Sequence, residues 1–372
     1  MKVAVLEYLS GGGLQKDVNS TSLFNEGLAM LTALAIDLAL CGHDVHTCLD
    51  GKAADDPSVA FRSAKAALCA SFAERKTQLI VHQIDHDNDE HSWMNRWIEV
   101  ASQCDQTIVI APEIHQQLEN IVAKLRRSGA IVVASSETFL HATSDKLSTA
   151  SLFKKSQVPH PATQSLSSYL TSIDQLDESK PASAVTLKRR DGAGCVDMKV
   201  FANRGKLTDW LQNYAPQNLL RDEWIIQPWL IGRPASMALL AGDEWQLLGA
   251  VDQHITLDHS SKQIGYAEVS YLGGSGPLRG VSVEQLENLA SQVREALPSG
   301  AASWIGIDFL VPDESVDSKN LIVIEVNPRL TTSYLGYRKW YGYKLADALL
   351  GNVSFSDLKL TMNQQRIPFD AS

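Results

Sequence analysis

The sequence is short of cysteine and of positive charge, and each shortage excludes a class of protein. Its five cysteines are scattered and form no C-x-x-C pair, which favours the reducing cytoplasm. Lys and Arg number 33 against 43 Asp and Glu, which gives a formal net charge of −10. Because nucleic-acid binding needs a clustered basic surface, we expect neither DNA nor RNA as a partner.

Long apolar runs are also missing. No uninterrupted apolar stretch is long enough to cross a bilayer, so we expect no membrane partner. The N-terminus, MKVAVLEYL, carries one lysine and a short apolar run before Gly11, which predicts a first strand rather than a signal peptide. The composition, 44% hydrophobic, is typical of a soluble globular protein. The oligomeric state stays open between a monomer and a homodimer.

Several catalytic signatures are absent from the chain. It has no G-x-x-x-x-G-K-[ST] phosphate-binding loop and no G-x-S-x-G elbow. LSGGGLQ lacks the G-x-G-x-x-G pattern and no ribose-binding acid follows it at the expected distance, which weighs against a dehydrogenase, one alternative function. HQIDHDNDEH, residues 82–91, has no regular ligand spacing, so we interpret it as a solvated loop.

The length suggests two or three domains, and we predict three, at 1–112, 113–228 and 229–372. In the first, strand patterns alternate with helical patterns, which predicts a parallel sheet covered by helices. The expected strands are 3–6, 44–47, 79–82 and 107–110, and the expected helices are 23–40, 57–74 and 91–104.

The other two domains mix helices with short strands, so the fold class is α/β and α+β. In the second we expect a helix ending at Arg127 and a helix starting near Ser144. We expect strands at 130–135, on both sides of a glycine turn within 181–202, and at 223–230. In the third we expect strands at 236–240, 245–251, 303–311 and 321–327, with one clear helix at 283–297.

Acidic and amide side chains interrupt two apolar strand patterns near the C-terminus. In SWIGIDFLV the acid is Asp308, and in LIVIEVNPR Glu325 and Asn327 share one face. Antiparallel pairing would bring Asp308 beside Glu325, and two adjacent carboxylates repel unless a cation lies between them. Their oxygens suit Mg²⁺, with Mn²⁺ as the alternative ion.

Arg329 follows on the same face and favours this interpretation. A fixed guanidinium beside a metal site is suited to holding phosphoryl oxygens. The alternative is that Asp308 and Glu325 lie on a solvated sheet face or pair with Arg329.

Upstream, two lysines and a glycine loop could serve a nucleotide. SAVTLKRRDGAGC places Lys188 at the end of a strand, before a loop whose glycines allow backbone N–H groups to approach phosphates. TSDKLSTA places Lys146 in the first turn of a helix, with Ser144 or Thr143 as the cap. Each feature alone is also typical of an ordinary turn or a surface lysine.

The order of these features resembles the ATP-grasp superfamily, whose fold here would follow an N-terminal Rossmann-like, or pre-ATP-grasp, domain. The resemblance implies that Lys146 and Lys188 contact nucleotide phosphates and that Asp308, Glu325 and Asn327 hold Mg²⁺. Arg329 would meet phosphate or an acyl phosphate. The loop residues Asp191, Gly192 and Gly194 would cover ATP, and the hinge residues Gln227, Pro228, Trp229 and Leu230 would hold adenine. In IGRPAS, Pro234 stands where many members have a ribose-binding Glu, so the ribose contact is unassigned.

A closer resemblance lies in four stretches: LEYLSGGG, the following NEGLAMLTALAIDLALCGHDVHTCLD, APEIHQQLE and SDK. They resemble the tyramine-glutamate ligase branch, which is involved in making methanofuran-type cofactors. The resemblance implies an ADP-forming ligase that joins a small carboxylate, glutamate, to an amine such as tyramine or tyrosine. The alternative is an ATP-binding protein of the same fold without ligase activity.

Two further features point to the substrates. RLTTSYLGYRKWYGY contains aromatic residues that could wall a pocket for an aromatic amine, and YLGGSGPLRG contains Arg279, which could hold a free carboxylate. The alternative is that these aromatics belong to the core and that Arg279 is solvated.

Overall fold

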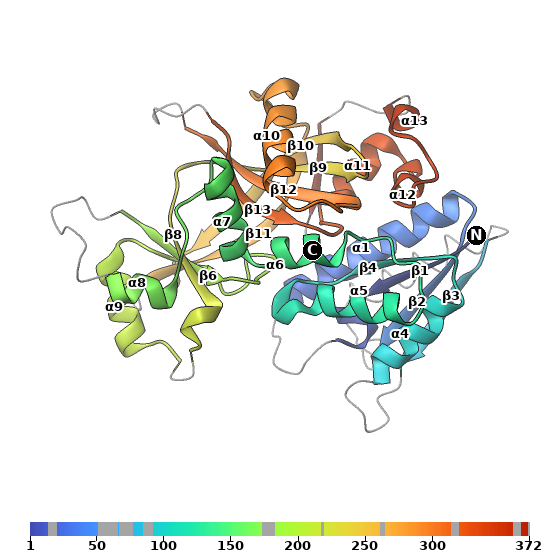
Figure 1. Cartoon of the computed structure of the whole chain (residues 1–372), viewed down its shortest axis with the longest axis horizontal. Helices are drawn as coiled ribbons and strands as arrows, with labels where there is room; N and C mark the ends of the chain where they lie inside the picture. Colours follow the sequence, from blue (N-terminus) through green and yellow to red (C-terminus); the bar gives the residue numbers. More distant parts are fainter. Residues whose placement is uncertain are drawn as a thin grey trace.

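The computed structural model contains two sheets, one parallel and one antiparallel (Figure 1). It describes residues 1–13, 21–50, 66, 77–84, 92–172, 183–216, 219–260, 265–313, 320–359 and 366–370. The expected helix at 57–74, apart from residue 66, and residues 85–91 of the expected solvated loop lie outside the described residues.

The first sheet is parallel, as its alternating pattern predicts. Its spatial order is β3 (Leu79–Ile84), β2 (Asp44–Asp50), β1 (Lys2–Glu7) and β4 (Gln106–Ile110). The expected strand at 130–135 contributes only a single parallel bridge between Thr107 and Val132. Between β1 and α1 lies a tight turn, η1 (Leu9–Gly13), where Gly12 has φ +102° and an added Cβ would meet Trp93 at 2.6 Å.

Helices cover the first sheet. They are α1 (Thr21–Leu40), α4 (Ser92–Ser102), η2 (Ile114–Gln116) and α5 (Gln117–Arg127). Contrary to our expectation, Ser22–Leu40 is long and apolar enough to cross a membrane by length and composition, and 67% of it is buried within the protein. Its apolar residues form the core against β1 and β2, and this burial accounts for the hydropathy.

The second sheet is antiparallel in its pairings and larger. Along it lie β13 (Ile322–Asn327), β12 (Ser303–Pro312), β9 (Gly232–Ala241), β10 (Trp245–Asp258), β11 (Tyr266–Gly276), β7 (Lys199–Phe201), β6 (Val185–Arg189), β8 (Trp224–Pro228) and β5 (Gln164–Ser165), while β14 (Ile367–Asp370) pairs with β11. The strands that the sequence predicts in this region are present, and β5, β11 and β14 were not foreseen.

Two further cores lie on this sheet. One packs α6 (Glu137–Ser144), α7 (Lys146–Ser156) and α10 (Val283–Ala296) on β9, β10, β12 and β13. The other packs α8 (Leu166–Ser172) and α9 (Arg204–Asn213), with the short η4 (Arg221–Glu223) nearby, on β6, β7 and β8. In Figure 1 this smaller part lies apart from α1 to α5, on the left.

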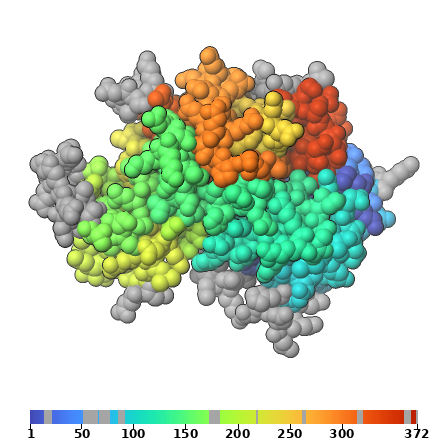
Figure 2. All heavy atoms as spheres, in the orientation of Figure 1, coloured from blue at the N-terminus to red at the C-terminus, as the bar shows by residue number. Residues whose placement is uncertain are grey.

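The C-terminal helices belong to the first core. They are α11 (Tyr334–Tyr341), α12 (Lys344–Leu349) and α13 (Phe355–Lys359), and the first two pack on α1. The buried Asp37 of α1 accepts hydrogen bonds from Tyr334 Oη at 2.7 Å and Arg338 Nε at 2.8 Å. We call the first sheet with its helices the first unit, and the second sheet with its helices the second unit. Figure 2 shows the teal and blue part of the first unit packed directly against the orange and green part of the second. The boundaries at 112 and 228 stay a prediction.

Candidate active site

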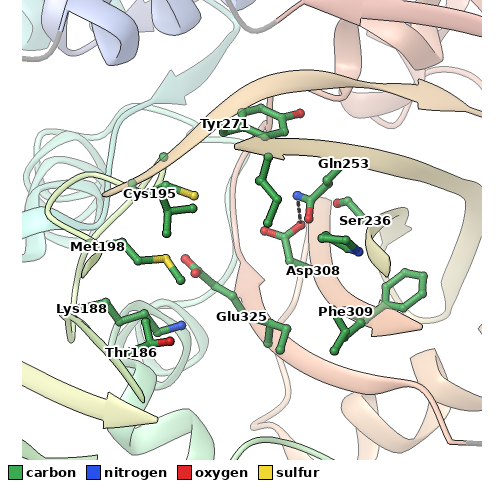
Figure 3. Close-up of a pocket in the computed structure, with 18 of the residues that line it drawn as sticks. Thr186, Lys188, Cys195, Met198, Ser236, Gln253, Tyr271, Asp308, Phe309 and Glu325 are labelled. Atoms are coloured by element: carbon green, nitrogen blue, oxygen red, sulfur yellow. Dashed lines mark hydrogen bonds between the residues drawn. The ribbon is translucent and has the colours of Figure 1, made fainter. Parts of the chain in front are cut away.

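A cavity of about 460 Å³ lies between the smaller part of the second sheet and its larger part. Figure 3 shows Thr186, Lys188, Cys195 and Met198 on one side of it, and Ser236, Gln253, Asp308 and Phe309 on the other. We call the first side, with Lys146 and Lys188, the cationic wall, and the second, with Asp308, Glu325 and Asn327, the acidic wall.

Strand alternation sets the orientation of Lys188 in the cationic wall. On β6, Thr186 and Lys188 line the cavity while Val185 and Leu187 enter the core against α8 and α9. Lys188 is 6% exposed. Burial lowers the pKa of Lys188 to about 8, and the positive charge of Lys146 adds to this decrease. The negative charge of Glu325 opposes it but does not cancel it. The cavity therefore holds a lysine that is costly to charge without an anion.

Lys146 is the first residue of α7, and its ammonium group bridges the two walls. Its Nζ lies 3.0 Å from Glu325 Oε1 and also donates to the carbonyl of Gly192 in the glycine loop. The helix cap is Asp145, which accepts from Leu147 N at 2.9 Å, so the expected cap at Ser144 or Thr143 is wrong. Ser144 instead ends α6, and the two helices meet at Asp145.

In the acidic wall the strand register is the one expected. On β12 and β13, Asp308 pairs with Glu325 and Gly306 with Asn327. Asp308 Oδ1 accepts from Gln253 Nε2 and Asp308 Oδ2 accepts from Asn327 Nδ2, each at 3.1 Å. Burial and the charge of Glu325 raise the pKa of Asp308 to about 6. The carboxylates of Asp308 and Glu325 therefore lie side by side in the lining of the cavity.

This donor set fits a magnesium ion. Mg²⁺ binds oxygen ligands from one or two carboxylates and keeps several waters. Asp308 and Glu325 supply two carboxylates in register, and the amide of Asn327 adds an oxygen on the same side. The raised pKa of Asp308 is the effect expected of paired carboxylates that a cation would neutralise.

The hinge and most of the glycine loop line the cavity. Gln227, Pro228, Trp229 and Leu230 do so, as do Gly192 and Gly194. Gly194 has φ +61°, and an added Cβ would meet Leu23 of α1 at 2.5 Å, so the loop is fitted closely to the first unit. Asp191 is not among the lining residues. Its carboxylate accepts from His115 N at 2.8 Å and Arg189 Nε at 3.1 Å, and it therefore fastens the loop.

Arg329 lines the cavity, and a hydrogen bond to Glu113 holds its guanidinium group in place. Its Nε donates to Glu113 Oε1 at 2.9 Å, and Glu113 is 3% exposed. Glu113 follows β4 of the first sheet, so the two units together set the direction of this guanidinium.

Arg279 and the C-terminal aromatics do not lie at the cavity. Arg279 is exposed and outside the lining, and its carbonyl accepts from Arg233 Nη2. Of the aromatics, Tyr343 is 42% exposed and the others are core residues. The pocket wall expected from Tyr334, Tyr337, Trp340, Tyr341 and Tyr343 is therefore wrong, because α11 turns its aromatic face onto Trp304 and the first core.

Three of the lining residues that the sequence interpretation missed carry polar groups and come from three different elements. Glu26 comes from α1, Gln253 from β10 and Tyr271 from β11. An acid within an otherwise apolar helix was a usable signal for Glu26, since a buried charge needs a reason. Nothing local marks Gln253 or Tyr271, because their position depends on the pairing of β10 with β11.

The chain matches two protein families in the expected order. Residues 66–138 match the pre ATP-grasp 3 domain, and residues 143–333, more than half of the chain, match the ATP-grasp domain. The chain is a member of the ATP-grasp family. The two walls and the glycine loop all lie within the second match.

Among curated proteins, this ATP-grasp protein is similar to tyramine--L-glutamate ligase of Methanocaldococcus jannaschii, with 22% identity over 153 residues. That match covers 41% of this chain and 44% of the relative, so it spans less than half of either.

Solved structures share the fold. An ATP-grasp superfamily protein from Archaeoglobus fulgidus has a TM-score of 0.61 at 20% identity, with 95% of this chain and 89% of that chain covered. Biotin carboxylase from Campylobacter jejuni has a TM-score of 0.65 at 14% identity, with 97% of this chain and 73% of that chain covered. N5-carboxyaminoimidazole synthetase from Staphylococcus aureus has a TM-score of 0.59 at 13% identity, with 99% of this chain and 79% of that chain covered.

Proposed function

We propose that this protein is an ATP-dependent carboxylate-amine ligase that forms an amide and ADP through an acyl phosphate. The observation that carries the proposal is the pair of opposed walls. Buried Lys146 and Lys188 face the partly buried Asp308 and Glu325 across a cavity of about 460 Å³ that the glycine loop and hinge help to line. Membership of the ATP-grasp family supports it.

A carboxylate is a poor electrophile, and transfer of the γ-phosphoryl group of ATP to it creates a good leaving group. Phosphoryl transfer asks mainly for positioning and charge neutralisation. Lys146 and Lys188 would neutralise the nucleotide phosphates, and Arg329, held by Glu113, would hold the transferred phosphoryl group. Gly192 to Cys195 would cover the site and exclude water from the acyl phosphate.

Asp308, Glu325 and Asn327 would hold Mg²⁺, or Mn²⁺, which when bound neutralises phosphate charge. Gln227 to Leu230 would hold adenine along the hinge. Gln227 itself is buried, and its Nε2 donates to Thr163 Oγ1 at 2.8 Å, which leaves its amide oxygen as an acceptor.

For the substrates we propose glutamate as the carboxylate and an aromatic amine such as tyramine or tyrosine as the acceptor, in methanofuran-type cofactor synthesis. The similarity to tyramine--L-glutamate ligase supports this choice.

The test is ADP release measured with Mg²⁺ and ATP across a matrix of amino acids and amines that includes glutamate, tyramine and tyrosine. We expect ADP and an amide only when a carboxylate and an amine are both present. ATP binding without ADP release from any pair would contradict the ligase proposal and leave an ATP-binding protein. ADP release with a different carboxylate and amine would replace the proposed substrates and leave the ligase proposal unchanged.

A further inference from the structure

Glu26 is an acid in the cavity that the proposed ATP and metal sites do not use. Among the described lining residues the acids are Glu26, Asp308 and Glu325, and Glu26 alone comes from the first unit. It is 6% exposed. Its carboxylate accepts hydrogen bonds from Thr332 Oγ1 at 3.0 Å and Ser22 Oγ at 3.1 Å, so it is fixed at the cavity edge.

This carboxylate forms no ion pair with a Lys, Arg or His of the described chain. The charge of Arg329 acts on it, but Arg329 already donates a hydrogen bond to Glu113 at 2.9 Å. Tyr271 of β11 and Cys195 of the glycine loop line the same cavity, and the charge of Glu26 contributes to the raised pKa of both. A buried carboxylate with hydroxyl donors and no cation can accept a cationic ligand.

The neighbouring wall suits an apolar ligand body. Ile255, Leu257, Val269 and Tyr271, on the paired strands β10 and β11, line the cavity. Figure 3 shows the Tyr271 ring lying over the Gln253 and Asp308 side. A primary amine with an aromatic or alkyl body would place its nitrogen at Glu26 and its body along this wall.

We infer that Glu26 binds the nitrogen of the acceptor amine and takes its proton during amide formation, an inference that rests on the proposed ligase function. The amine enters as an ammonium ion and loses one proton to solvent. The nitrogen lone pair then forms the C–N bond with the acyl carbon, the C–O bond to phosphate breaks, and phosphate leaves with that electron pair. The second proton of the nitrogen passes to a Glu26 carboxylate oxygen, which leaves a neutral amide.

The electrostatics of Glu26 agree with this role. Burial raises its pKa, and the hydrogen bonds from Thr332 and Ser22 and the charge of Arg329 offset the increase only in part. A carboxylate with a raised pKa is a better proton acceptor near neutral pH.

The experiment compares Glu26→Gln with the parent enzyme in two reactions with the same ATP and carboxylate. In one the acceptor is the amine found by the substrate matrix. In the other it is hydroxylamine, a small nucleophile that is largely uncharged at neutral pH and that traps an acyl phosphate as a hydroxamate. The glutamine variant keeps the shape and an acceptor oxygen for Thr332 but loses the charge. Glu99→Gln, at a surface acid of α4 with its side chain 56% exposed, is the matched control.

We expect Glu26→Gln to lower kcat/KM for the amine about 100-fold, the usual contribution of a proton-transfer group, while hydroxamate formation stays within about threefold. Retained hydroxamate formation also reports a folded protein. Unchanged amide formation, or equal loss of both products, would overturn the assignment of Glu26. If the parent enzyme makes neither ADP nor hydroxamate with any carboxylate, the ligase proposal itself fails.

Discussion

The two walls of the cavity are built differently. The acidic wall lies on β12 and β13, and β12 pairs with β9 along its whole length from Ser303 to Pro312 and with β13 on its other side. The cationic wall lies on the five-residue strand β6, at the start of α7 and beside a loop in which Gly194, Cys195 and Asp197 have positive φ. Long pairing on both sides fixes Asp308, and pairing with β12 fixes Glu325, whereas the lysines depend on a short strand, a helix start and loop contacts.

This difference separates a rigid half of the site from an adjustable one. Metal ligands tolerate little displacement, which suits the placement of Asp308 on a strand with two paired neighbours and of Glu325 and Asn327 on the strand beside it. Phosphate-binding lysines on flexible stems can follow a ligand, and a glycine loop can close over it. Variants on the acidic wall should therefore abolish chemistry, and variants on the cationic wall should mainly weaken binding.

The largest effect is expected for Glu325→Gln. It removes one carboxylate from the rigid wall, and we expect the ligase rate to fall by roughly 10² to 10⁴ at saturating Mg²⁺ because several kcal/mol of charge stabilisation is lost. The fold should persist, since lost pairing with Lys146 is offset by relief of repulsion with Asp308. Steady-state ADP release measures this, with the exposed Glu287→Gln on α10 as control. Near-normal turnover would remove the metal assignment.

Lys188→Met should produce the next largest effect, and in binding rather than in fold. A charge-assisted contact to phosphate is removed, so ATP affinity should fall about 10- to 100-fold. Isothermal titration with ATP measures it against Lys206→Met, an exposed lysine of α9. Unchanged affinity would show that Lys188 does not meet the nucleotide.

The pH dependence of ATP binding should show the two walls titrating separately. Lys188, with a pKa of about 8, loses its charge as pH rises, and Asp308, with a pKa of about 6, loses its charge as pH falls. Lys188 and Asp308 are both charged only between these values. Above pH 8, binding must take up a proton, so affinity should fall about tenfold between pH 7 and 9. The decline should disappear in Lys188→Met, and a decline of the same size there would assign it to another group.

Asp191→Asn should have a smaller effect, because Asp191 holds the loop rather than the nucleotide. Weakening its bonds to His115 N and Arg189 Nε should raise the KM for ATP about two- to fivefold, the value of one modest hydrogen bond. Turnover at saturating ATP should be unchanged. A loss as large as that of Lys188→Met would place Asp191 at the ligand, as the sequence first suggested.

Arg279→Ala should have the smallest effect. The side chain is exposed and outside the cavity, so we expect the KM of either substrate to change less than about twofold, as for ordinary surface substitutions. A selective rise in the KM of the carboxylate would restore Arg279 to the site.

The acidic wall could be predicted from the sequence because its signal is local. Glu325 and Asn327 alternate with apolar residues on one strand, and Asp308 interrupts another a short loop away, so the register follows from a hairpin. The four parallel strands of the first sheet were also predictable, because strand and helix patterns alternate along that part of the chain.

The missed residues depend on contacts between distant segments. Glu26 reaches the cavity only because α1 packs against residues 331–333, which lie about 300 residues later in the chain. The aromatic run after β13 was ambiguous because Tyr and Trp serve pockets and cores equally well. The aromatic residues of α11 belong to the core because α11 packs against α1.

The buried contact between Asp37 and Arg338 also has a consequence for synthesis. These residues are 301 positions apart, so α1 leaves the ribosome long before its partner exists. At about 5 to 20 residues per second the delay is roughly 15 to 60 s. During that interval α1 carries an unpaired acid, and the part of its surface that α11 and α12 later cover is exposed. The last helices of the chain therefore complete the first unit that is made, and chains that stop before Tyr334 should be substrates for chaperones and proteases.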